Sequence, residues 1–329
     1  MSLRLSIIGV GKLGAIHARL AAATPDAELV GVYDIDTDRA AELARSHRVR
    51  PFATLEEAIE ASDACVVVTP TSTHRVVAEQ IMRGGCDVFI EKPVTTSVAE
   101  ADSLAAVAEQ TDRVVAVGHV ERFNPAFLGA ADSPEPLFIE AHRLARFSPR
   151  ATDVAVIFDL MIHDIDLVLT MLGGAEPTEI RASGVAVASD EIDIANARLE
   201  FASGCTANLT ASRISRNPMR KMRLFSRDCY TSLDFGEPSV ERFRILRGKG
   251  GPTDTPHDLT DLDASDKVNL ADVAYERPTM PTINAIGREL ELFVRAAIDR
   301  TEPPVTLAEG RRAVAVAEEI VRIIDERRS

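Results

Sequence analysis

The sequence predicts an α/β protein whose N-terminal part is a parallel, doubly wound sheet. Two observations carry this prediction. An apolar strand pattern, Leu3 to Val10, runs directly into a glycine-rich turn and then into a helical pattern. Strand-like and helical segments then alternate as far as residue 118. The chain of 329 residues is long enough for two domains, which we expect to span residues 1–120 and 121–329.

The glycine-rich turn, GVGKLG, predicts a dinucleotide site of the Rossmann type. Gly9 permits the tight turn, Gly11 lets the backbone approach a pyrophosphate, and Gly14 lets the helix pack closely on the strand. Lys12 and Leu13 lie between these glycines, where the helix begins and its free N–H groups can face phosphates. All five residues are therefore expected to bind the cofactor.

An acidic residue stands where this fold recognises ribose. Asp34 follows the second strand, Glu28 to Tyr33, and comes twenty residues after Gly14. Its carboxylate can accept hydrogen bonds from ribose hydroxyls and would repel a 2′-phosphate, so the sequence favours NAD over NADP. Arg39, one turn into the next helix, keeps NADP open as the alternative.

Further polar segments follow two predicted strands. The segment from Thr69 to His74 ends the strand Ala64–Val68, and Glu91-Lys92-Pro93 ends the strand Cys86–Ile90. Ligands of such sheets sit at the carboxyl ends of the strands. This position predicts cofactor contacts from Thr69, Pro70, His74, Glu91 and Lys92. The alternative for His74 is a helix-capping or surface residue.

Lys92 has two interpretations. It can be a solvated lysine paired with Glu91, next to a turn stiffened by Pro93. In a partly desolvated cleft beside a positively charged nicotinamide, its pKa would instead fall, and the amine could exchange protons near neutral pH.

A second polar segment is the predicted buried helix Asp159 to Thr170, which carries ionisable groups between apolar flanks. At about 100° per residue, Asp159, His163 and Asp166 share one stripe, and Asp164 lies off it. Buried charge needs a partner. The stripe is therefore either a satisfied core network or one wall of an active site.

Composition excludes several classes of function. A net charge of −14 argues against nucleic-acid partners and anionic membrane surfaces. No apolar run reaches membrane-spanning length, and the N-terminus enters a strand at once instead of a signal peptide. The four scattered cysteines form no CxxC pair, which favours a reduced, metal-free, cytoplasmic protein.

Four motifs together give the chain a family resemblance: GVGKLG, TP-x-x-x-H at Thr69 to His74, EKP at Glu91 to Pro93, and D-x-x-x-H at Asp159 and His163. In this combination the chain resembles the Gfo/Idh/MocA oxidoreductases over nearly its whole length. The resemblance implies an N-terminal Rossmann domain and a C-terminal α+β domain. That second domain would have an open, mostly antiparallel sheet, which often mediates homodimers or homotetramers in the family.

The resemblance also implies chemistry, with Lys92, Asp159 and His163 as the catalytic group. One departure is Met161, where many members have glycine. The segments Gly118 to Phe127 and Phe147 to Asp166 are similar to a subgroup that oxidises the 3-hydroxyl of UDP-N-acetylglucosamine with NAD. On this interpretation Arg122, Phe123 and Asn124 lie near the sugar, beside Lys92 and His163.

The second half predicts strands at Leu137–Leu144, Glu179–Ala188, Ile192–Phe201 and Gly204–Ser212, and closing helices at Ile283–Asp299 and Leu307–Arg327. Residues 242–281 are rich in glycine, proline and aspartate and predict a long irregular excursion. A basic cluster consists of Arg213, Arg216, Arg220, Lys221 and Arg223. It is either a solvated face or a clamp for the diphosphate of a nucleotide sugar.

Three alternatives to that function remain open. A free-sugar or inositol dehydrogenase of the same family would use the same residues on another substrate. A non-catalytic NAD-binding regulator need not keep Lys92, Asp159 and His163 together. A metal site at Asp159 and His163 lacks an evident third ligand, so we predict no metal.

Overall fold

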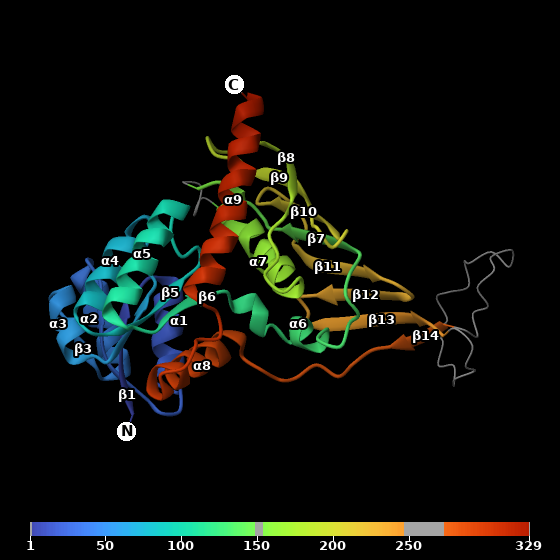
Figure 1. Ribbon diagram of the computed structural model, residues 1–329. Coiled ribbons are helices and arrows are strands. Elements are labelled where there is room, and N and C mark those ends of the chain that lie inside the picture. The colour runs from blue at the N-terminus through green and yellow to red at the C-terminus, as the bar shows by residue number, and fades with distance from the viewer. Residues whose placement is uncertain (1, 149–153, 247–272, 329) are drawn as a thin grey trace, which may run out of the picture. The chain divides into compact units, whose positions relative to one another are not determined.

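The computed structural model describes residues 2–148, 154–246 and 273–328 and divides the chain into two compact units. The first unit comprises residues 1–123 and 283–318, and the second comprises residues 124–282 and 319–329. Figure 1 follows the chain from strand β1, in blue, to helix α9, in red.

The first unit is built on a six-stranded sheet in the order β3-β2-β1-β4-β5-β6, in which every neighbouring pair is parallel. Its strands are β1 (Leu3–Ile8), β2 (Ala27–Tyr33), β3 (Arg50–Pro51), β4 (Ala64–Val67), β5 (Asp87–Glu91) and β6 (Val115–Gly118). The helices between them are α1 (Lys12–Ala21), α2 (Thr37–His47), α3 (Leu55–Ala61), α4 (Thr71–Arg83) and α5 (Val98–Thr111). The predicted parallel sheet is confirmed.

Two of these helices begin at the capping residues that the sequence predicts. The hydroxyl of Thr54 accepts a hydrogen bond from the N–H of Glu57 at 3.2 Å, which caps α3. The Glu57 carboxylate reaches back to the N–H of Ala53 at 3.0 Å, one residue before the position expected for a capping box. Ser97 caps α5 in the same way through the N–H of Glu100.

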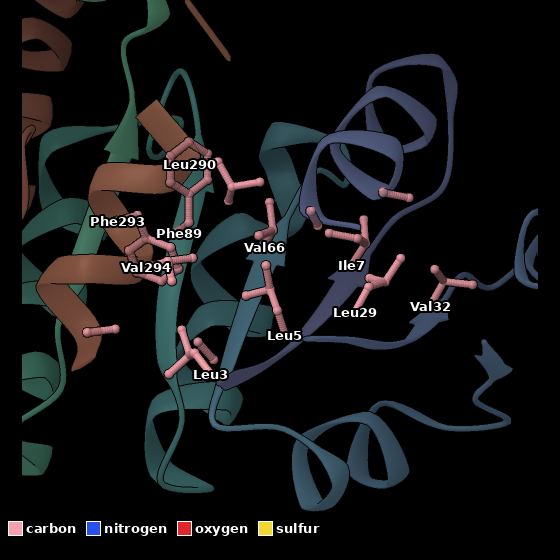
Figure 2. Packing of buried hydrophobic residues seen from close by; sticks show 14 of the residues in the cluster. Leu3, Leu5, Ile7, Leu29, Val32, Val66, Phe89, Leu290, Phe293 and Val294 are labelled. Atoms are coloured by element: carbon pink, nitrogen blue, oxygen red, sulfur yellow. The ribbon is translucent and has the colours of Figure 1, made fainter. Parts of the chain in front are cut away.

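The core of the first unit includes a helix from the far end of the chain. Alternate residues of β1, among them Leu5 and Ile7, are fully buried against Ala18 of α1 and Phe293 of α8 (Ala285–Asp299). Figure 2 shows Leu290, Phe293 and Val294 packed around Phe89 of β5. Helix α4 packs beside α5 on β4 and β5.

The expected division at residue 120 is therefore corrected for the C-terminal helices. Residues 283–318 belong with the first unit because the apolar face of α8 completes that unit's core. Val117 of β6 also donates its N–H to the carbonyl of Val305 at 3.0 Å. Helix α9 (Leu307–Arg328) begins in the first unit, and its residues from Glu319 onward group with the second.

The second unit contains an eight-stranded sheet in the order β14-β13-β12-β11-β7-β10-β9-β8. All neighbouring pairs are antiparallel except β7 with β10. The strands are β7 (Phe138–Leu144), β8 (Glu179–Val185), β9 (Ile194–Glu200), β10 (Thr206–Ser212), β11 (Met219–Ser226), β12 (Cys229–Asp234), β13 (Ser239–Ile245) and β14 (Val273–Glu276). The mostly antiparallel second sheet is confirmed.

The excursion predicted for residues 242–281 is wrong at both ends. Residues 242–245 complete β13, residues 273–276 form β14, and these two strands pair with each other. The charged residue Arg242 takes a buried position in β13, so the sequence did not show the alternation of apolar and polar residues typical of a strand. Residues 247–272 lie outside the described part of the chain.

Short helical segments complete the second unit. These are α6 (Pro125–Gly129), the π-helical turn η2 (Ile157–Met161) and α7 (Ile162–Met171); the 3-10 turn η1 (Val120–Phe123) ends the N-terminal part of the first unit. Helix α7 packs on β7 and β10, and α6 on β12 and β13. None of the helices in the described ranges is long and apolar enough to cross a membrane.

Candidate functional site

The glycine turn has the geometry that its sequence predicts. Gly9 has a φ of +92°, and a Cβ there would lie 2.8 Å from the Val68 carbonyl carbon. A Cβ on Gly14 would lie 2.0 Å from the Gly9 carbonyl oxygen, so only glycine lets α1 begin this close to β1. A Cβ on Gly11 would meet no atom within 4 Å. Gly11 thus leaves open space at the N-terminus of α1, where phosphates bind.

A cavity of about 550 Å³ lies at the amino ends of the strands, but the larger one, about 910 Å³, lies at their carboxyl ends. The larger cavity is lined by Gly9 and Gly11, by Asp34 and Arg39 beyond β2, and by Thr69 and Pro70 beyond β4. This combination of a glycine turn, a helix N-terminus and an acidic residue fits the adenosine and pyrophosphate parts of a dinucleotide. Lys12 is exposed and Leu13 half-buried at the start of α1.

Asp34 organises the edge of this cavity. One carboxylate oxygen accepts the N–H of Val10 at 2.7 Å, and the other accepts the N–H of Asp36 at 2.9 Å. Each oxygen keeps a lone pair for a ribose hydroxyl. Arg39 Nη1 lies 4.0 Å from Asp34, while Nη2 pairs with Asp36 at 3.0 Å. The arginine that could favour NADP is thus engaged by two carboxylates.

His74 is neither a cap nor a surface residue. It is buried in the first turn of α4, with Nε2 2.9 Å from the Thr69 carbonyl and Nδ1 3.0 Å from the Pro93 carbonyl. Burial lowers the pKa of the imidazole from its usual 6.5, although both carbonyls favour the charged form. His74 therefore ties together two loops of the predicted cofactor edge and does not line the cavity described above.

Glu91 is also buried and holds the turn that carries Lys92. One carboxylate oxygen accepts the N–H of Lys92 at 3.1 Å, and the other lies 2.8 Å from Nε2 of His17. Glu91 is not among the residues that line the larger cavity. The Lys92 side chain itself is half-buried.

Side-chain contacts of Arg122, Phe123 and Asn124 fix the position of this segment. Arg122 Nη1 donates to Glu309 at 2.7 Å, and Phe123 is buried. Burial alone would raise the pKa of the Glu309 carboxyl, but hydrogen bonds from the Thr306 N–H and from Arg122 hold it below its usual range. Asn124 caps α6 through the Ala126 N–H, as the sequence predicts, and donates to the Phe235 carbonyl at 3.2 Å.

The predicted buried helix begins with a π-helical turn. Asp159 lies in that turn, η2, and His163 lies one turn later in α7; both are half-buried. π-helical turns are rare and often occur at functional sites. The wider turn changes the angular offset expected between Asp159 and the residues of α7. Met161 is buried in the same turn.

Asp164, which lies off the polar stripe, is part of the structural network. Its carboxylate takes three contacts from the Arg143 guanidinium, at 2.8, 3.1 and 3.1 Å, and both side chains are about 5% exposed or less. This pair joins α7 to β7. The core-network interpretation of the helix therefore holds for Asp164.

Arg213 is neither on a solvated face nor open to a ligand in this structure. Its side chain is buried, with Nε 2.7 Å from Asp193 and Nη1 2.6 Å from the Val154 carbonyl. Burial alone would raise the pKa of the Asp193 carboxyl, but N–H donors from Ala188 and Val187, together with Arg213, hold it well below its usual range. The guanidinium thus supports the β8–β9 loop.

Arg216 differs from Arg213 because it is exposed in the turn between β10 and β11. Further along the cluster, Lys221 and Arg223 pair across the sheet with Asp234 and Glu140 at 3.1 and 3.0 Å. The basic cluster is therefore not one continuous clamp.

Comparison with known proteins decides the family. Residues 3–119 match a family model described as an oxidoreductase family with an NAD-binding Rossmann fold, and residues 105–228 match the GFO/IDH/MocA C-terminal domain. The chain is 44% identical to UDP-N-acetylglucosamine 3-dehydrogenase of Acidithiobacillus ferrooxidans, over 96% of its own length and 95% of that relative. The chain belongs to the Gfo/Idh/MocA family of oxidoreductases.

A solved structure and a more distant sequence relative are also similar to this chain. The structure of UDP-N-acetylglucosamine 3-dehydrogenase GnnA from Acidithiobacillus ferrooxidans matches with a TM-score of 0.88 and 38% identity, covering 99% of this chain and 98% of that one. Inositol 2-dehydrogenase of Rhizobium meliloti is more distant, with 26% identity over 100% of this chain and 98% of that relative.

Two features of this Gfo/Idh/MocA chain were missed by the sequence analysis. His17 stands three residues after Gly14 on the buried side of α1, and Asp193 precedes β9. A polar residue on the buried face of a short helix was the available signal for His17. Among the residues that the structure describes, no group of three or more histidine, cysteine or acidic side chains could hold a metal ion.

Proposed function

We propose that this chain is an NAD-dependent dehydrogenase that oxidises the 3-hydroxyl of UDP-N-acetylglucosamine to a ketone. The observation that carries the proposal is its 44% identity, over nearly the full length of both chains, to an enzyme of that name. The presence of Lys92, Asp159 and His163 in the motifs EKP and D-x-x-x-H supports catalysis over a purely regulatory role.

The first unit would hold the cofactor. The open space over Gly11 and the N–H groups at the start of α1 suit the pyrophosphate, and the Asp34 carboxylate suits a ribose diol. NAD held there would supply the acceptor for the hydride of the sugar carbinol carbon. Thr69 and Pro70 line the same cavity.

The proposed proton transfer uses the three residues of the motifs EKP and D-x-x-x-H. His163 would take the hydroxyl proton on its imidazole, and Asp159 would favour the imidazolium as a carboxylate partner does. The Lys92 ammonium would donate a hydrogen bond to the same substrate oxygen and stabilise the negative charge that develops there.

The nucleotide part of the substrate needs a cation. We propose Arg216 for this role, because it is exposed while Arg213 is buried against Asp193. Arg122, Phe123 and Asn124 would shape the sugar site through the backbone of η1 and the start of α6, since their side chains support that segment.

The substitution Lys92→Met tests the catalytic assignment. We expect turnover to fall by about a hundredfold or more, the usual scale for losing acid–base assistance. NADH affinity should stay within about threefold of wild type, because the glycine turn is unchanged. Lys221→Met is the matched control, since Lys221 pairs with Asp234 on the second sheet. Near-normal turnover in Lys92→Met would refute the assignment.

A substrate panel tests the sugar. NADH formation is measured with UDP-N-acetylglucosamine, other UDP-sugars, free sugars and inositols. The proposal requires the highest kcat/KM on UDP-N-acetylglucosamine. A preference for an inositol would instead assign the chain to the inositol dehydrogenase branch, to which its more distant relatives belong.

We propose further that the enzyme is a homo-oligomer formed through the second sheet. Phe138, Phe225, Tyr230, Phe243 and Tyr275 form a row across five strands, with ring centroids 4.9–6.0 Å apart. Along each strand these residues alternate with the residues that face α6 and α7, so the row lies on the opposite face of the sheet. Phe225 is 39% exposed and the other four rings are half-buried, and a partly exposed apolar patch of this kind can mark a contact surface. Phe225→Glu should lower the mass measured by light scattering, and an unchanged mass would exclude this surface.

A further inference from the structure

The carboxylate of Glu91 joins two parts of the first unit that are far apart in the sequence. One oxygen accepts the backbone N–H of Lys92 at 3.1 Å, and the other lies 2.8 Å from Nε2 of His17, in the middle of α1. Because the carboxylate can only accept, Nε2 of His17 carries the hydrogen in this contact. A chain of two hydrogen bonds thus runs from α1 to the residue proposed for catalysis.

The packing around the pair leaves it little freedom. His17 is fully buried, and its ring lies against Phe89 at a centroid distance of 5.6 Å. A Cβ on Gly118 would lie 3.1 Å from the Glu91 carboxyl carbon, so β6 closes the other side of the carboxylate. A buried, hydrogen-bonded acid of this kind fixes its neighbours in one geometry.

The helix that carries His17 also carries the phosphate site. Helix α1 begins at Lys12, directly after Gly11, and reaches His17 between one and two turns later. A helix this short moves as one body, so the position of its N-terminus and the position of the imidazole are linked. On the other side of Lys92, His74 contacts the Pro93 carbonyl at 3.0 Å.

We propose that His17 is a positioning residue which, through Glu91, fixes the backbone at Lys92 relative to the phosphate-binding end of α1. This inference rests on the proposed role of Lys92. It predicts that losing the His17 donor loosens the Lys92 turn and lowers turnover, while the phosphate site itself remains.

The test compares His17→Leu with His17→Gln in the full chain. Amide hydrogen exchange at Lys92 should be about tenfold faster in His17→Leu, because Glu91 loses the donor that orients it. Turnover should fall by about tenfold, while the NADH dissociation constant stays within about threefold of wild type. His17→Gln should restore both values, because its amide N–H can reach the position of Nε2.

Two further variants serve as a control and as an alternative test. Leu20→Ala loosens the same helix without touching Glu91, so it should leave exchange at Lys92 no faster than in the rest of the first unit. If His17→Leu does not fold, Glu91→Gln tests the link from its other end, since a side-chain amide turns one acceptor into a donor. The expected result is again faster exchange at Lys92.

The proposal is overturned if exchange at Lys92 is unchanged in His17→Leu, or if exchange rises evenly through β1, β4 and β5. Failure of His17→Gln to restore exchange would also overturn it. Hydrogen exchange needs no substrate. If wild type oxidises no sugar, the proposed function fails, and the exchange result still decides whether His17 positions Lys92.

Discussion

Replacing Gly11 by alanine should remove most NAD binding while leaving the fold in place. The backbone at Gly11 has φ −64°, which alanine adopts freely, and the new Cβ meets no atom within 4 Å. The loss of stability should be about 1 kcal/mol or less, the difference between glycine and alanine at a helix N-cap. The new methyl group occupies the space through which the pyrophosphate approaches the helix N-terminus.

Gly14→Ala is the contrasting variant. Its Cβ would lie 2.0 Å from the Gly9 carbonyl oxygen, where ordinary contact begins at 3.4 Å. Helix α1 would have to move by more than about 1 Å, at a cost of about 1–3 kcal/mol for overpacking. This variant should therefore lose both stability and NADH binding.

The assay combines NADH fluorescence titration with urea unfolding. The chain has no tryptophan, so protein emission interferes little with NADH fluorescence. We expect Gly11→Ala to weaken NADH binding by at least about tenfold, or about 1.4 kcal/mol. Binding within about twofold of wild type would refute the assignment of Gly11 to the pyrophosphate site. A stability loss in Gly11→Ala equal to that in Gly14→Ala would refute the packing argument.

Two further predictions concern buried groups. Asp164→Ala leaves the Arg143 guanidinium buried without its carboxylate and should cost about 3–5 kcal/mol in urea unfolding. Glu179→Ala, which breaks an exposed pair, should cost less than about 1 kcal/mol, and equal losses would contradict the role of burial. The pKa of His74 is lower in the folded protein than its usual 6.5. Its contribution to the free energy of unfolding is therefore present above pH 6.5 and is lost as the pH falls below that value. His74→Gln should flatten this acid dependence of the unfolding free energy, and an unchanged slope would contradict it.

Features that depend on local sequence could be predicted from the sequence alone. The glycine turn, Asp34, and the caps at Thr54 and Asn124 each depend on residues that are close together in the chain or on one strand–helix–strand unit. Their signals are glycine at a positive φ or a close approach, and a short polar side chain before a helix. Local backbone geometry alone selects these residues, so one sequence suffices to predict them.

The partners of buried polar residues were decided only by the tertiary structure. His17 meets Glu91 across 74 positions, Asp87 meets Arg300 across 213, and Arg213 meets Asp193 across 20. Sequence pattern placed Arg213 in a basic cluster, but the path of β9 and β10 brings Asp193 against it. A charged side chain acquires its role from whatever the whole fold places beside it. The same holds for α8, which was predicted as a helix but whose partner in the first unit was not predicted.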